Sequence, residues 1–221
     1  MKTGQYVIIG LGRFGANLGI QLMEMGCEVL GIDKDEEAVD EMSELLTHTV
    51  VADATDEQTL RSLGVRNFDC GIVAIGNDIQ MSILTTILLK EMGVKTVIAK
   101  AISKLHGRAL EKLGVDRIVY PERDMAIRVA HQLVTPHLLD YLELSGEYSI
   151  VELKVPACLH DMTLADLNSR TRFGCTVVAL HTSAGVRIAP TAMDRLHKDD
   201  IMVVIGSNDN LERFEDEVVN E

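Results

Sequence analysis

Residues 6–15 read YVIIGLGRFG, and the fold can be worked out from this stretch. Tyr6 to Ile9 is a short apolar run of the kind that forms a buried strand, and it ends at a glycine. Apolar residues then recur at helical spacing, at Phe14, Leu18, Leu22 and Met25. The stretch therefore predicts a strand, a glycine-rich turn and a helix that ends at Gly26.

The same alternation of strand and helix continues downstream. Further apolar runs predict strands at 28–32, 49–52, 71–75, 96–99 and 117–120, with helical patterns between them. Six strands separated by helices predict an α/β fold with a Rossmann-like, doubly wound parallel sheet.

The pattern changes after Pro121. Met125, Val129 and Leu133 form one helical stripe, which Pro136 should end or kink. A second helix is expected over residues 137–144. A small α+β unit follows, with strands at 149–155, 175–180, 185–188 and 200–205, a short helix at 164–169 and a terminal helix at 208–219. The predicted organisation is a nucleotide-binding domain at 3–121, a crossover and dimerisation helix at 122–136, and a C-terminal domain at 137–219.

Composition limits the function classes. The net charge of −13 disfavours nucleic acid as a partner, because the surface repels phosphate backbones. No apolar run approaches the roughly 18 residues that span a bilayer, and no signal peptide is visible, so we expect a cytosolic protein. The four cysteines form no CxxC pair, which indicates free thiols, and the histidines show no zinc-binding spacing.

The glycine loop has the context that a dinucleotide-binding fingerprint needs. Gly10 permits the tight turn, Gly12 lets a diphosphate approach the backbone, and Gly15 lets the helix lie close to the strand. The helix N-terminus attracts phosphate. Asp33 ends the next strand, where a carboxylate accepts hydrogen bonds from ribose hydroxyls and disfavours the 2′-phosphate of NADP.

Four residues near this loop have two interpretations each. Arg13 either pairs with additional phosphate charge, such as the γ-phosphate of ATP, or points into solvent. Asp53 and Thr55 either contact the adenine or cap the helix that begins there. Lys100 faces either the phosphates or solvent.

Signatures of enzymes with this fold are missing. No tyrosine is followed four residues later by lysine, and there is no Gly-x-Ser-x-Gly elbow or Walker lysine. We therefore expect the nucleotide to be a regulatory ligand. The alternatives are an NAD-dependent oxidoreductase and a module that senses the NAD(H) ratio.

The chain resembles the RCK family (regulators of potassium conductance), of the Ktr/Trk cytosolic subunit type. The resemblance rests on VIIGLGRFG, GIDKDEEAV, VVADATDEQTLRSLGVRNFD, IVAIGNDIQMSILTTILLKEMGV, RIVYPERDMAIRVA and YSIVELKVP, with weaker agreement through RTRFGCTVVAL. It implies a homodimer built with the crossover helices, dimers assembled into an octameric ring, and docking of the ring on the inner face of the membrane through a potassium-translocating subunit. It also implies activation by ATP, inactivation by ADP and binding of NAD(H) in the same cleft.

The resemblance assigns roles to individual residues. It implies that Arg13 meets the γ-phosphate, often of a neighbouring protomer's ATP, and that Asp33 binds ribose. Glu122 matches a glutamate that holds a divalent cation, Mg²⁺ or Ca²⁺, although a carboxylate at a helix start is also favoured by the helix dipole. The full set expected to bind the nucleotide is Gly10, Gly12, Arg13, Phe14, Gly15, Asp33, Lys34, Asp53, Ala54, Thr55, Ile75, Gly76 and Lys100.

A second ligand is implied by relatives that bind cyclic di-AMP in the C-terminal domain. Arg170 and Arg172 are candidates for its phosphates, and Thr176 and Pro190 lie where such a site would form. The alternative is that the two arginines are simply exposed before a strand.

Overall fold

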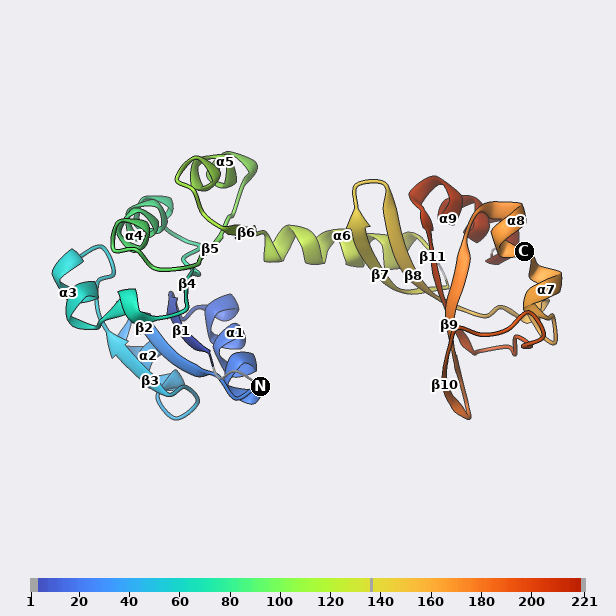
Figure 1. The fold of residues 1–221 in the computed structure, drawn as a ribbon, viewed down its shortest axis with the longest axis horizontal. Helices are drawn as coiled ribbons and strands as arrows, with labels where there is room; N and C mark the ends of the chain where they lie inside the picture. Colours follow the sequence, from blue (N-terminus) through green and yellow to red (C-terminus); the bar gives the residue numbers. More distant parts are fainter. Residues whose placement is uncertain (1–3, 136, 220–221) are drawn as a thin grey trace. The chain divides into compact units, whose positions relative to one another are not determined.

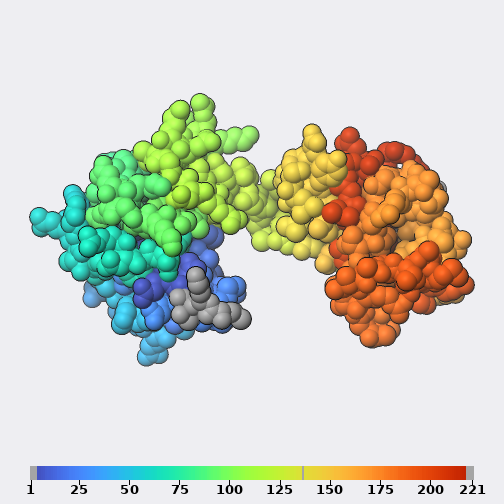
Figure 2. Space-filling model, viewed as in Figure 1, coloured from blue at the N-terminus to red at the C-terminus, as the bar shows by residue number. Residues whose placement is uncertain are grey.

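The computed structural model describes residues 4–135 and 137–219. The chain divides into two compact units, Met1–Glu122 and Arg123–Glu221. In Figures 1 and 2 the first unit is coloured from blue to green and the second from green to red, so each is built from one continuous stretch of sequence.

The first unit contains six strands and the helices that connect them. Its strands are β1 (Gln5–Ile9), β2 (Glu28–Asp33), β3 (His48–Val51), β4 (Cys70–Val73), β5 (Val97–Lys100) and β6 (Arg117–Val119). Its helices are α1 (Arg13–Glu24), α2 (Glu36–Met42), α3 (Glu57–Ser62), η1 (Val65–Asn67), α4 (Ile79–Glu91) and α5 (Lys104–Lys112), and α6 (Pro121–Val134) begins at its end.

The strands form one parallel sheet in the order β3-β2-β1-β4-β5-β6. The chain adds β2 and β3 on one side of β1 and then returns to add β4, β5 and β6 on the other. This reversal between β1 and β4 is a topological switch point, where α/β sheets hold ligands beyond the carboxyl ends of their strands. The expected doubly wound fold is confirmed.

Both faces of the sheet are covered. Along β1, Ile8 belongs to an apolar core that α1 and α2 cover, whereas Val7 and Ile9 belong to a core that α3, α4 and α5 cover. Figure 1 shows the two groups of helices on opposite sides of the strands. All three side chains are almost fully buried, as alternate residues of a central parallel strand should be.

The second unit is built around an antiparallel sheet. Its strands are β7 (Leu138–Ser145), β8 (Tyr148–Lys154), β9 (Thr176–Thr182), β10 (Gly185–Ile188) and β11 (Ile201–Ser207), in the order β10-β9-β11-β8-β7. Its helices are η2 (Ala157–Leu159), α7 (Leu164–Leu167), α8 (Ser169–Phe173) and α9 (Asn208–Phe214), and a π-helical segment spans Glu215–Val219. Phe173 and Phe214 meet edge to face in the apolar core of this unit.

The helix expected over residues 137–144 is wrong, because this segment forms β7. Its apolar residues fit helical spacing and strand alternation equally well, and Ser145-Gly146 looked like a helix end. In the structure, Ser145 pairs with Tyr148 across a two-residue turn, and Leu142 pairs with Ile150 of β8. Pairing with the next strand of a hairpin thus decided the structure of the segment. Pro136, expected to end the preceding helix, lies outside the described residues.

Side chains from β7 hold the C-terminal half of α6. Both oxygens of Asp140 accept hydrogen bonds from the Arg128 guanidinium, the shortest at 2.7 Å, which lowers the pKa of the Asp140 carboxyl. The His131 and Tyr141 rings stack with centroids 4.1 Å apart. These contacts join the end of α6 to the edge strand of the second sheet.

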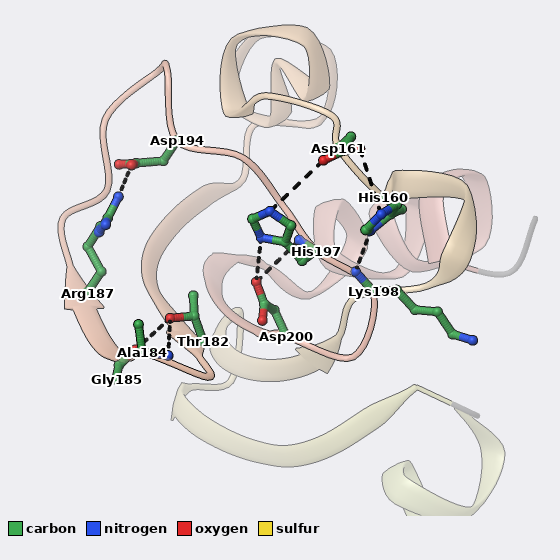
Figure 3. A network of polar contacts seen from close by, with 10 residues as sticks. All are labelled: His160, Asp161, Thr182, Ala184, Gly185, Arg187, Asp194, His197, Lys198 and Asp200. Carbon is green, nitrogen blue, oxygen red and sulfur yellow. Dashed lines mark hydrogen bonds and ion pairs between the residues drawn. The ribbon is translucent and has the colours of Figure 1, made fainter.

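Loops of the second unit are fixed by polar contacts, shown in Figure 3. His197 lies with Nδ1 3.4 Å from Asp200 and Nε2 4.0 Å from Asp161. The His160 Nε2 atom lies 3.7 Å from Asp161 on the other side. Arg187 and Asp194 form a further ion pair across the β10 loop.

Candidate functional site

A cavity of about 440 Å³ lies at the switch point, beyond the carboxyl ends of the strands in the first unit. Loops after β1, β2, β3, β4 and β5 contribute to its wall, as does the first turn of α6. The lining consists of Ile9, Gly10, Gly12, Arg13, Phe14, Ile32, Asp33, Lys34, Asp35, Ala38, Ala52, Ala54, Ala74, Ile75, Gly76, Asn77, Met81, Lys100, Ile102 and Glu122.

The glycine loop has the backbone geometry that each glycine was expected to provide. Gly10 has a φ of +99°, a conformation that favours glycine, and its N–H donates to the Ile32 carbonyl at 2.8 Å. A Cβ at Gly15 would overlap with the Gly10 carbonyl oxygen. A Cβ at Gly12 would meet nothing within 4 Å, so the backbone there is open to a ligand.

Helix α1 starts at this loop without a side-chain cap. Gly12 is its N-cap residue and supplies no hydrogen bond from a side chain, and the first turn carries no acidic residue. By contrast, α2, α3, α4 and α5 each begin with a side-chain cap, which is respectively Asp35, Asp56, Asp78 and Ser103. The N–H groups at the start of α1 are therefore left for an acceptor from outside the chain, and phosphate is the acceptor that such a helix end favours.

Asp33 is held in place at the end of β2. Its Oδ2 accepts a hydrogen bond from the Leu11 N–H at 2.6 Å, and its Oδ1 accepts one from the Asp35 N–H at 3.0 Å. These two bonds fix the carboxylate at the cavity wall, beside the glycine loop. Each oxygen keeps a lone pair for a ribose hydroxyl.

The cavity wall also carries the cations of Arg13 and Lys100 and the carboxylate of Glu122. The Lys100 Nζ lies 2.6 Å from Glu122 Oε1 and 5.9 Å from the centroid of the Phe14 ring. The hydrogen bond from Lys100, with smaller attraction from the Lys100 and Arg13 charges, lowers the pKa of the Glu122 carboxyl. Arg13 is exposed and forms no ion pair with a described residue.

A small apolar region lies between β2, β3 and α4. Ala38, Ala52 and Ala54 line it, and the Lys34 ammonium lies 3.5 Å from the Met81 sulfur at its border. Small alanines leave room for a flat ring.

Ten residues of the set expected to bind the nucleotide line the cavity: Gly10, Gly12, Arg13, Phe14, Asp33, Lys34, Ala54, Ile75, Gly76 and Lys100. Glu122, expected to hold a cation, lines it as well. Gly15, Asp53 and Thr55 lie outside the lining. Asp53 Oδ1 accepts hydrogen bonds from the Thr55 hydroxyl and amide, which lower the pKa of Asp53. Neither residue caps α3, because Asp56 does.

Sequence reasoning missed several members of the lining, among them Asp35, Asn77, Met81 and Ile102. Asn77 and Asp78 both precede α4, and the side chain of Asp78 is the cap of this helix. A usable signal was present, because Asn77 and Ile102 follow β4 and β5, whose carboxyl ends flank the switch point.

The residues named for cyclic di-AMP lie in the second unit. Arg170 is exposed and donates to the Thr176 hydroxyl at 3.4 Å, while Arg172 stacks over the Phe173 ring at 4.7 Å. Pro190 is half-buried after β10. The structure therefore brings Arg170 and Thr176 together.

The described residues, 4–135 and 137–219, also limit which kinds of site the chain contains. No helix there is both long enough and apolar enough to span a membrane. Residues 4–135 and 137–219 also contain no group of three or more histidine, cysteine, aspartate or glutamate residues placed to hold a metal ion.

Comparison with known proteins agrees with this geometry. Residues 6–121 match the family model of the TrkA-N domain, and residues 149–219 match that of the TrkA-C domain. The chain is 47% identical to Ktr system potassium uptake protein C of Bacillus subtilis (strain 168), with 98% of each chain covered. The chain belongs to the TrkA-domain family. It is also 36% identical to Ktr system potassium uptake protein A of Vibrio alginolyticus, over 96% of this chain and 97% of that one.

These relatives confirm the resemblance seen in the sequence. Solved structures with a similar fold include an RCK domain. The GsuK RCK domain superposes with a TM-score of 0.55 at 21% identity and covers 100% of this chain. The GsuK channel bound to NAD gives a TM-score of 0.54 at 21% identity. The chain spans 48% and 39% of the length of these two GsuK chains. At this level of identity the likeness shows the fold.

Proposed function

We propose that this TrkA-domain protein is the nucleotide-binding regulatory subunit of a Ktr-type potassium uptake system. The observation that carries the proposal is the uncapped start of α1, which opens on a cavity lined by the fixed carboxylate of Asp33 and by the cations of Arg13 and Lys100. Identity of 47%, over 98% of the chain, to a Ktr system potassium uptake protein supports the assignment to a Ktr-type potassium uptake system.

In this proposal the ligand is an adenine nucleotide. Its phosphates bind the N–H groups at the start of α1, its ribose binds Asp33, and its base lies over the alanines beside Met81. Asp53 and Thr55 follow β3 at the base end, and Gly15 holds the loop in shape. The GsuK channel bound to NAD has the same fold, which keeps NAD(H) as the alternative ligand.

ATP activates and ADP inactivates in this proposal, and Arg13 supplies the difference. Its exposed guanidinium at the cavity wall is suited to the γ-phosphate, which ADP lacks. A ligand shifts a conformational equilibrium only through a difference in its affinity for the two states. Contacts of the γ-phosphate with Arg13, in the same or a neighbouring protomer, provide that difference.

The partners follow from the same proposal. They are a membrane-embedded potassium-translocating subunit and further copies of this chain, in a dimer and an octameric ring. A divalent cation at Glu122, and cyclic di-AMP at Arg170, Arg172, Thr176 and Pro190, remain predictions. The role is regulatory rather than enzymatic.

Replacement of Arg13 tests the proposal. We expect the unaltered chain to bind ATP more tightly than ADP in calorimetry, and Arg13→Ala to weaken ATP binding about tenfold while ADP changes little, because one charge-assisted contact is lost. Potassium flux through the membrane subunit should then respond equally to ATP and ADP.

Arg108→Ala is the matched control, since Arg108 is an exposed arginine on α5 outside the cavity lining. An unchanged ratio of ATP to ADP affinity in Arg13→Ala would contradict the assigned role of Arg13. Tight binding of NADH without binding of ATP or ADP would favour the NAD(H)-sensing alternative.

A further inference from the structure

Lys100 is a buried cation whose partner is an exposed carboxylate. Only 8% of Lys100 is exposed, whereas the Glu122 side chain is 62% exposed. Lys100 ends β5 and Glu122 lies in the first turn of α6, and their side chains meet at 2.6 Å inside the wall of the cavity. A buried ammonium needs such a partner, because an unpaired buried charge is strongly destabilising.

A phosphate that enters this end of the cavity meets a cation that is already paired. The ammonium of Lys100 has three N–H donors and no acceptor, and one of its donors is directed at Glu122. Glu122 carries the same sign of charge as the phosphate. Phosphate and Glu122 are therefore rivals for the same ammonium.

We propose that Glu122 is an internal competitor of the ligand's phosphates for Lys100, so that occupancy of the phosphate end releases Glu122 and the first turn of α6. This inference rests on the proposed nucleotide function of the cavity and specifies how binding is sensed there. It assigns Glu122 a role in the ligand-free protein that depends on this chain's own lysine.

The location of Glu122 makes the exchange useful for regulation. Glu122 is part of a helix that continues to Val134, whose far half is held by Arg128–Asp140 and by the stacked His131 and Tyr141. Release of Glu122 removes an ion pair that ties the start of α6 to β5. The ion pair between Lys100 and Glu122 therefore connects the cavity wall to the start of α6, and a phosphate that binds Lys100 breaks it.

A double-mutant cycle measured by calorimetry tests the competition. Adenosine, ADP and ATP are titrated into the full chain, Glu122→Gln, Lys100→Met and the double variant, in buffer with a chelator so that no divalent cation occupies the carboxylate. We expect Glu122→Gln to tighten ATP and ADP about fivefold, as for loss of a partly exposed ion pair, and to leave adenosine unchanged. In the Lys100→Met background, Glu122→Gln should have no effect on any ligand.

Asp124→Asn serves as the charge-matched control, because Asp124 lies on the same helix outside the cavity lining. It should leave the affinity for ATP unchanged within about twofold, as removal of an exposed charge does. Tightening equal to that of Glu122→Gln would mean that the overall negative charge of the chain, rather than competition, sets the affinity. If Lys100→Met does not fold, Lys100→Gln takes its place in the cycle. Unchanged or weaker ATP binding by Glu122→Gln rejects the competition even without the cycle.

Three results would overturn the inference. Unchanged or weaker ATP binding in Glu122→Gln would show that Glu122 does not compete. Tightening that persists without Lys100 would show direct repulsion of phosphate by the carboxylate instead. Absence of nucleotide binding to the unaltered chain would overturn the proposed function itself, and is recognised by that measurement alone.

Discussion

The start of α1 in the first unit and the loops of the second unit satisfy their polar groups in different ways. In the second unit, α7 begins with a reciprocal capping box between Thr163 and Asp166, and α9 is capped by Ser207. Histidines and aspartates of its loops pair with one another (Figure 3). In the first unit, α1 begins at Gly12 with no side-chain partner, directly beside the cavity.

The contrast extends to two carboxylates. Lys100 lowers the pKa of Glu122 in the cavity wall, whereas burial raises the pKa of Glu215 in the second unit to about 7. The first carboxylate pairs with Lys100, which lines the cavity, and the second is hydrogen-bonded, among the described residues, to the Thr135 hydroxyl at 3.5 Å. The Glu122 carboxylate beside the cavity thus points to ligand binding. The Glu215 carboxylate, which has no cation beside it among the described residues, instead makes the stability of the folded chain depend on pH.

Gly15→Ala should have the largest effect, because it breaks the start of α1 itself. The new Cβ would overlap with the Gly10 carbonyl oxygen, a backbone atom that cannot move away without opening the loop. We expect a loss of about 3 kcal/mol or more in the free energy of unfolding, measured by urea denaturation.

Gly12→Ala is the matched control for this substitution. Its Cβ would meet nothing within 4 Å, so the cost should stay below about 1 kcal/mol, the value for a poor N-cap residue. Equal destabilisation by the two changes would show that the contact between Gly15 and Gly10 is not what holds the loop.

The first unit could be predicted closely from sequence because its signals are local. Each strand is a short apolar run, most helices end at a glycine, and Gly10, Gly12 and Gly15 lie next to one another in the chain. Asp33 could be placed because the end of the second strand always returns to the same edge of a parallel sheet. These features need no knowledge of distant contacts.

The remaining features depend on contacts between different elements of the fold. The strand β7 is specified by its pairing with β8, since its own spacing of leucines also fits a helix. The ion pair between Lys100 and Glu122 arises because β5 and the first turn of α6 both reach the cavity wall. Met81 reaches the cavity from α4, and only the position of that helix over the sheet places it there.

Glu215→Gln should have the next largest effect, and its sign depends on pH. In the folded chain burial raises the carboxyl pKa from its usual 4.5 to about 7, with neighbouring Asp216 and Glu212 adding to the rise. Between these values the folded state holds a proton that the unfolded state has lost, so stability falls as pH rises through this window. Gln carries no charge, and the variant should be about 2 kcal/mol more stable than the unaltered chain at pH 8, with little difference near pH 4.5.

Glu143→Gln on β7 is the control for Glu215→Gln, because Glu143 is exposed in the same unit. Its stability should follow that of the unaltered chain at both pH values. The gain in unfolding free energy for Glu215→Gln could instead be the same at pH 4.5 and pH 8. The carboxylate charge would then not be the cause, and Glu215 would no longer contrast with Glu122.

Gly12→Asp should change stability least and yet affect binding most. It gives α1 a side-chain cap of the kind that begins α2, α3, α4 and α5. Gly12 has φ −66° and ψ −178°, the extended conformation of an N-cap residue, and a side chain there meets no neighbour. The new carboxylate would accept hydrogen bonds from the N–H groups that we assign to phosphate. We expect a gain of a few tenths of a kcal/mol in unfolding free energy without ligand, and loss of detectable ATP and ADP binding in calorimetry.

Gly12→Ser separates the effect of the cap from the effect of the charge. It caps the helix without a charge and should weaken binding less than Gly12→Asp does. If Gly12→Asp still binds ATP normally, the phosphates do not lie at the start of α1, and the uncapped helix has another explanation.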